Sequence, residues 1–122
     1  DAGVRVLELM KVIGSPEWMR SDDDYRKLGA VSYQRGHNPA GFKRQLAAIV
    51  ASGSRDAALA NLSIPTLVIH GTNDLLVRPA GGKHTAAIVP GAELVLIEGM
   101  GHDLPVPRHD QMVAAIRPVS GV

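Results

Sequence analysis

The spacing of apolar residues predicts that the first half of the chain is helical. Val6, Leu9, Met10 and Ile13 recur at helical spacing and form a one-sided apolar stripe. The segment Gly14-Ser15-Pro16 follows this stripe, and glycine and proline both disfavour continuation of a helix. A first helix that ends at Gly14 is therefore expected.

Three further helices are predicted before the pattern changes. The acidic cluster at residues 21–24 provides a cap for the second helix. Asn38 provides a cap for the third, and Pro39 falls in its first turn, where the missing N–H is tolerated. One face of the third helix carries Phe42, Leu46, Ile49 and Val50. The expected helices cover residues 23–35, 39–52 and 55–60.

From Ile64 onward, short runs of apolar and branched residues alternate with helical patterns. Residues 65–71 and 93–98 are typical of strands that are buried on both faces, as in parallel sheets. Helices are expected over 79–89 and 107–117, the last with Met112, Val113 and Ile116 toward the core. A strand–helix–strand connection places its two strands side by side and parallel. The predicted fold class is therefore α/β, with helices first and a βαβα unit after them.

Composition narrows the class of protein. With 122 residues, 45% of them hydrophobic and 20% charged, the chain has the make-up of one globular domain. A net charge of +1 gives no reason to expect nucleic acid or a membrane surface as a partner. The absence of cysteine excludes disulfides and a thiol nucleophile. The apolar runs are too short for a membrane span, and no signal peptide is evident, so a cytoplasmic protein is expected.

Two polar loops follow the two predicted strands, and each carries one group suited to acid–base chemistry. Asp74 follows the first strand and His102 the second. Because the carboxyl ends of parallel strands lie at the same edge of a sheet, the two side chains are expected to meet. A carboxylate beside an imidazole orients the base that activates a nucleophile. Asn73 competes for the role of Asp74, and His70, inside the strand, is interpreted as a structural residue hydrogen-bonded near the site.

The two loops and their strands resemble a known family. The stretches IPTLVIHGTNDLLVRPAGG and PGAELVLIEGMGHDLP are similar to the end of the α/β-hydrolase fold, where the acid follows the seventh strand and the base follows the eighth. This resemblance implies a partial α/β-hydrolase fold of serine esterase or lipase type. Asp74 is then the triad acid and His102 the triad base, and no cofactor is needed. Residues 1–60 resemble a helical cap, or lid, and its return to the core, and residues 61–122 the end of that core.

The resemblance leaves one catalytic group without a candidate. The family's nucleophile lies in a G-x-S-x-G turn, and none of the serines of this chain lies in such a turn. The order nucleophile, acid, base places the nucleophile upstream of Asp1. We therefore expect a segment of a longer enzyme that acts on a small-molecule ester and is inactive alone. Its expected partner is the missing amino-terminal half or an exchanged copy of itself, because two strands leave open sheet edges.

Other interpretations of the same residues remain open. An Asp nucleophile, as in epoxide hydrolases and dehalogenases, fits the same acid and base, and so does a non-catalytic binding module. A metal site from His102, Asp103, His109 and Asp110 is conceivable by ligand type, but no third ligand converges at a recognisable spacing. Asp103 alone is interpreted as a loop or capping residue. Trp18, Met19, Tyr25 and Tyr33 are expected to pack within the cap, with a substrate cavity as the alternative.

Overall fold

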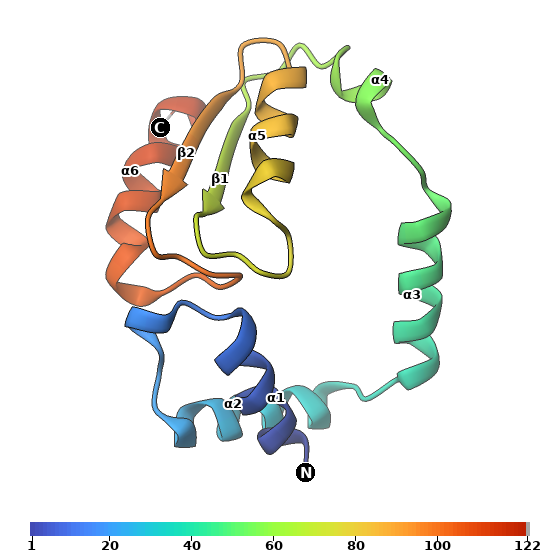
Figure 1. Cartoon of the computed structure of the whole chain (residues 1–122), viewed down its shortest axis with the longest axis vertical. Helices are drawn as coiled ribbons and strands as arrows, with labels where there is room; N and C mark the ends of the chain where they lie inside the picture. Colours follow the sequence, from blue (N-terminus) through green and yellow to red (C-terminus); the bar gives the residue numbers. More distant parts are fainter. Residues whose placement is uncertain (122) are drawn as a thin grey trace.

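A computed structural model describes residues 1–121 and contains every helix and strand that the sequence predicts. Some boundaries differ from the expectation by one to three residues. Figure 1 shows the first two helices directly below the βαβα unit, with the third and fourth helices along the other side of the molecule. The helices are α1 (Ala2–Ile13), α2 (Asp22–Arg35), α3 (Pro39–Ala51), α4 (Asp56–Leu59), α5 (Pro79–Ile88) and α6 (His109–Ser120).

Two parallel strands form the sheet. Strand β1 (Leu67–Gly71) pairs with β2 (Glu93–Ile97), in a register that places Gly71 beside Ile97. Helix α5 makes the crossover between them, and α5 and α6 flank the sheet (Figure 1). The first strand begins at Leu67 because Pro65 has no N–H to donate, although the carbonyl of Thr66 still accepts from the N–H of Glu93 at 2.9 Å. Both strands therefore end at the same edge, as predicted.

The core is small and lies between β2 and α6. Ile97, Met100 and Met112 form its buried cluster, and the partly buried Trp18 and Ile69 are among the residues that pack against it. Met112 faces the core as predicted. The same expectation was wrong for Val113 and Ile116, which are each 47% exposed. Within residues 1–121, no element covers their side of α6.

The strands are less buried than their sequences suggest. In β1 only Gly71 is buried, and in β2 only Ile97 is buried. The prediction of burial on both faces was therefore wrong for this chain. The physical reason is that both faces of this two-stranded sheet are apolar, and one helix on each side is too little to cover them. The edge of β1 that does not face β2 has no strand beside it among residues 1–121.

Helices α1 and α2 pack against each other beneath the carboxyl ends of the strands (Figure 1). Their contact buries Leu7 of α1 and Tyr25 of α2. The expected apolar stripe of α1 was partly wrong, because Leu9 is exposed and Leu7 takes the buried position. The short 3-10 helix Pro16–Trp18 follows α1 and directs Trp18 toward the core cluster. The amino-terminal segment thus contacts the sheet end of the molecule.

Helix α3 differs from the other long helices because none of its residues is buried. Asn38 caps it as predicted, with its side-chain oxygen accepting from the N–H of Gly41 at 2.8 Å. In Figure 1 it stands apart from the other elements. Its apolar face is open, with Phe42, Leu46, Ile49 and Val50 all exposed. No helix within residues 1–121 has the length and apolarity that a membrane span requires.

Candidate active site

Asp74 lies in the turn that follows β1, and its carboxylate is buried. Its side chain is 6% exposed. One carboxylate oxygen, Oδ1, accepts the backbone N–H groups of Leu76 at 2.9 Å and Val77 at 2.8 Å. The competing residue, Asn73, is exposed. The structure therefore orients Asp74 rather than Asn73 into the site.

His102 lies in the loop after β2 and meets Asp74. Its Nδ1 donates to the free carboxylate oxygen of Asp74, Oδ2, at 2.8 Å. Because an ionised carboxylate can only accept, a proton is on Nδ1, and in the neutral imidazole the other ring nitrogen, Nε2, therefore carries a lone pair. No hydrogen bond reaches Nε2 from residues 1–121. The imidazole side chain is 43% exposed, so this nitrogen remains available to a further group.

The two loops are held together by backbone hydrogen bonds that continue the sheet. Thr72 N–H donates to the carbonyl of Ile97 at 3.1 Å, and Asn73 N–H donates to that of Met100 at 2.9 Å. In return, Gly99 N–H donates to the Thr72 hydroxyl at 2.9 Å. The backbones come so close that a Cβ on Gly71 would collide with the Met100 carbonyl. The separation of Asp74 and His102 is thus set by the backbone.

The environment of Asp74 favours its ionised form. Burial raises the pKa of this carboxyl, but the hydrogen bond from His102 and those from the N–H groups of Val77 and Leu76 outweigh burial. The pKa is therefore held below its ordinary value. His70 completes the surroundings: its Nε2 donates to the Val77 carbonyl at 2.8 Å and lies 3.6 Å from Asp74 Oδ2. The prediction that His70 is bonded near the site is confirmed.

The lowered pKa of Asp74 gives a prediction for acid stability. The folded pKa lies below the unfolded value, about 3.9, so the stabilising contribution of the carboxylate is complete above that value. It is lost as the pH falls through the folded pKa. We expect the Asp74→Asn chain to lose less free energy of unfolding than the wild type between about pH 6 and about pH 2. Urea unfolding followed by circular dichroism measures both, with the exposed Asp110→Asn as control, and equal losses in Asp74→Asn and wild type would contradict the prediction.

Ser15 lies beside the site, although no pattern in the sequence indicates this. Its side chain is completely buried, and its hydroxyl bridges two residues of the His102 loop. It accepts the N–H of Gly101 at 2.9 Å and donates to Asp103 Oδ1 at 2.5 Å. The only local signal was Gly14-Ser15-Pro16, which was correctly interpreted as a helix end. The interpretation of Asp103 as a loop residue agrees with its role as acceptor of this bond.

The remaining histidines lie away from the pair. His109 Nε2 donates to the Leu104 carbonyl at 3.0 Å, and the exposed His84 pairs with Asp56 at 3.1 Å. Within residues 1–121, no three His, Asp or Glu side chains converge as metal ligands would. The set of His102, Asp103, His109 and Asp110 considered from the sequence therefore does not form a site in this geometry.

The Asp74–His102 pair opens into a small cavity. This cavity has a volume of about 320 Å³, and its lining includes His70, Val77 and Leu104. A neighbouring cavity of about 620 Å³ shares Asp103 and Leu104 with it and is lined by Trp18, Met19 and Tyr25. Three of the four aromatic and methionine residues considered from the sequence therefore border a hollow next to the site.

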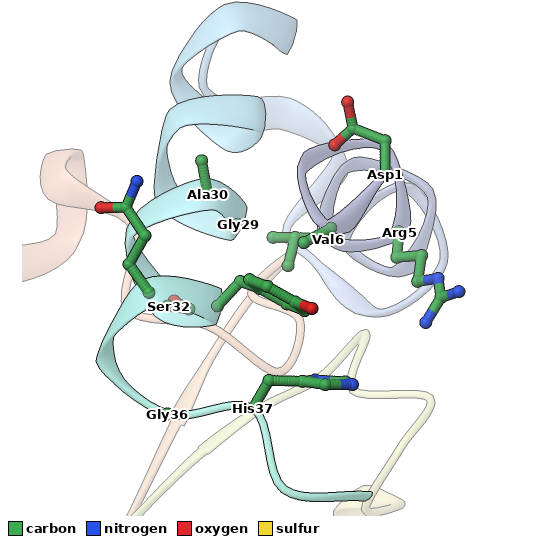
Figure 2. Close-up of a pocket in the computed structure, with 11 residues that line it drawn as sticks. Asp1, Arg5, Val6, Gly29, Ala30, Ser32, Gly36 and His37 are labelled. Atoms are coloured by element: carbon green, nitrogen blue, oxygen red, sulfur yellow. The ribbon is translucent and has the colours of Figure 1, made fainter.

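A larger hollow lies between α1 and α2 and does not reach the pair. Its volume is about 770 Å³, and Figure 2 shows Arg5 on one side and His37 below. The rings of Tyr33 and His37 are stacked, with their centroids 4.6 Å apart. It shares no lining residue with the cavity at Asp74 and His102. The size of a cavity therefore does not identify the chemistry in this chain.

Parallel strands that carry a carboxylate and an imidazole on successive carboxyl-terminal loops define the class of fold. The chain has a partial α/β-hydrolase fold, preceded by a helical segment. The solved structure of a meta-cleavage product hydrolase (CumD) variant superposes on 98% of this chain and 45% of its own, with a TM-score of 0.72 and 19% sequence identity. That likeness concerns the fold.

Similarity in sequence is found with two methylesterases of Streptomyces. Rhodomycin D methylesterase DauP from Streptomyces sp. (strain C5) is 43% identical over 63 residues, which are 52% of this chain. Rhodomycin D methylesterase DnrP from Streptomyces peucetius is 41% identical over 63 residues. The match covers 21% of the length of each of these two relatives. No family model matches the chain.

Proposed function

We propose that this chain supplies the acid and the base of a serine hydrolase that cleaves carboxylic esters. The observation that carries the proposal is the 2.8 Å hydrogen bond between His102 Nδ1 and Asp74 Oδ2 at the carboxyl ends of two parallel strands. The similarity to two methylesterases supports an ester substrate, and a methyl ester is the first to test. Asp74 is the proposed acid and His102 the proposed base.

The geometry suits general base catalysis at one atom of His102. A serine hydroxyl, from a segment outside this sequence, would give its proton to Nε2 as its oxygen attacks the acyl carbon. Asp74 keeps Nδ1 protonated and stabilises the imidazolium that forms. His102 then returns the proton to the alkoxy group as the bond from the acyl carbon breaks. Water, activated by the same nitrogen, releases the acid in the second half of the cycle.

The helical segment of residues 1–60 is proposed to act as the cap of this site. Its first two helices lie beneath the carboxyl ends of the strands (Figure 1). Trp18, Met19 and Tyr25 line the 620 Å³ cavity that adjoins the His102 loop. Such apolar side chains would hold the apolar part of an ester and limit the access of water. Residues 61–122 are proposed as the end of the catalytic core.

The proposed partner of this chain is the nucleophile-bearing part of the same enzyme. The edge of β1 that has no strand beside it among residues 1–121 offers backbone groups to another strand, and exposed apolar residues on α3 and α6 offer area for burial. A second copy of the chain that exchanges elements is the alternative occupant. In either case the apolar surface now exposed would become covered.

The experiment compares the 122-residue chain with and without the nucleophile-bearing part, supplied as a separate polypeptide or in one longer protein. We expect no hydrolysis of a methyl ester by the chain alone, because the attacking group is absent. Turnover should appear when both parts are present. A fluorophosphonate should label a serine outside this sequence, whereas an Asp nucleophile would not be labelled. Hydrolysis of the ester by the isolated chain would refute the division of the catalytic groups.

A further inference from the structure

We propose that Ser15 is a positioning residue for His102, an inference that rests on the proposed role of His102 as base. Three consecutive residues of the His102 loop are hydrogen-bonded to the end of α1 and to the turn that follows it. Gly101 N–H donates to the Ser15 hydroxyl at 2.9 Å, and His102 N–H donates to the Ile13 carbonyl at 2.6 Å. The Asp103 carboxylate accepts from the Ser15 hydroxyl. The helical segment therefore forms hydrogen bonds with the loop at His102 and at the residue on either side of it.

Because Ser15 is fully buried, loss of the hydrogen bonds of its hydroxyl would be costly in free energy. A fully buried hydroxyl without partners is costly, and here both its donor and an acceptor position are used. The bond to Asp103 is assisted by the charge of the carboxylate and spans 88 positions of the chain. The backbones are also in close contact, because a Cβ on Gly101 would collide with Gly14 and the Ile13 carbonyl. Ser15 thus connects elements that are remote in sequence.

The connection bears on the base because the imidazole is only partly enclosed. The ring is 43% exposed, and Asp74 provides its hydrogen bond among the described residues. A ring held by one bond keeps its orientation only if its own backbone is fixed. The bonds to Ile13 and Ser15 fix the backbone at 101–103 from the side of the helical segment. Ser15 therefore keeps Nδ1 on Asp74 and Nε2 free.

Nitrogen-15 NMR of the histidine rings in the full 122-residue chain tests this inference. The spectroscopic signature is the proton on His102 Nδ1, read from its tautomer population and its exchange rate with water. We expect Ser15→Ala to raise that exchange rate at least about tenfold, the size of effect that one lost hydrogen bond gives, and to populate the Nε2–H tautomer. The matched control is Ser52→Ala, which removes an exposed hydroxyl bonded only to the Ile49 carbonyl. The control should leave both readings unchanged.

Two variants at Asp103 keep the test decisive if Ser15→Ala fails to fold. Asp103→Asn retains an oxygen that accepts from the Ser15 hydroxyl, so it should preserve the His102 signals. Asp103→Ala removes the acceptor and should reproduce the effect of Ser15→Ala. The inference is overturned if the His102 signals of Ser15→Ala match the wild type, or if both Asp103 variants match it. It is also overturned if Ser52→Ala changes the signals as much as Ser15→Ala does.

The readout separates this inference from the proposed function. The NMR experiment needs neither an ester nor a nucleophile. If the assembled enzyme hydrolyses no ester but Ser15→Ala releases the ring, the proposed function fails and the positioning role stands. If Asp74→Asn abolishes hydrolysis while Ser15→Ala leaves the ring unchanged, the proposed function stands and the positioning role fails.

Discussion

Replacement of Asp74 by Asn is expected to lower kcat for ester hydrolysis about 10⁴-fold in the proposed serine hydrolase that contains this chain. The amide presents an NH₂ or a neutral oxygen where the carboxylate now accepts from His102 Nδ1 at 2.8 Å. The ring would then turn to the tautomer with its proton on Nε2, which cannot take a proton from a serine. KM should change little, because the Asp74 side chain is only 6% exposed and acts through its bond to His102. Steady-state kinetics with a methyl ester gives both constants.

The matched control for this variant is Asp110→Asn at the exposed start of α6. It makes the same chemical change away from the pair and should retain the wild-type kcat. A fall in kcat of less than about tenfold for Asp74→Asn would contradict the assignment of a triad acid, since loss of the correct tautomer costs far more. The fold of the variant should be checked by circular dichroism, because Asp74 also accepts two backbone N–H groups of its own turn.

The second large effect concerns stability. Gly71→Ala should lower the free energy of unfolding by about 3 kcal/mol, as expected for overpacking against groups that cannot move. The added methyl group would meet the carbonyl of Met100, which is backbone and not a flexible side chain. Relief requires the two strand-end loops to separate, and that separation also lengthens the Asp74–His102 bond. Urea unfolding followed by circular dichroism measures the change.

The control for this variant is Gly81→Ala in α5. A Cβ there meets only the Val77 side chain, at 3.6 Å, an ordinary contact. Alanine favours a helix over glycine by up to about 1 kcal/mol, so this variant should be slightly more stable than the wild type. If Gly71→Ala and Gly81→Ala had the same stability, the close approach of the two loops would not be a real constraint.

The pairing of Asp74 with His102 could be predicted because it depends on topology alone. Two strands joined by a helix are parallel and adjacent, so their ends coincide whatever surrounds them. The ends of most helices could also be predicted, because Asn38 and the glycines and prolines act locally. The start of β1 was placed too early because proline is tolerated at the first position of a strand, whereas the paired residues begin two positions after Pro65.

The role of Ser15 could not be predicted, because it depends on where the end of α1 docks. Its partners are 86 and 88 positions away, and no periodic pattern relates them. The burial of Val113 and Ile116 was overestimated for a related reason. An apolar residue on a helix indicates that its burial is favourable, but it does not identify the part of the protein that buries it. Contacts that follow from the topology of the two strands could be inferred from the sequence, whereas contacts that depend on where a helix docks could not.

The acid and the base are separated by only 28 positions, and both belong to one strand–helix–strand unit. The sheet edge that brings them together therefore forms within that unit and requires no strand from elsewhere, and the bonds to Ile13 and Ser15 then hold the His102 loop in place. A serine that arrives later, with another part of the protein, would encounter an imidazole whose tautomer has already been selected. Assembly would then create a reactive centre by adding one hydroxyl to an acid–base pair that is already formed. The same pair could be combined with different nucleophile-bearing parts.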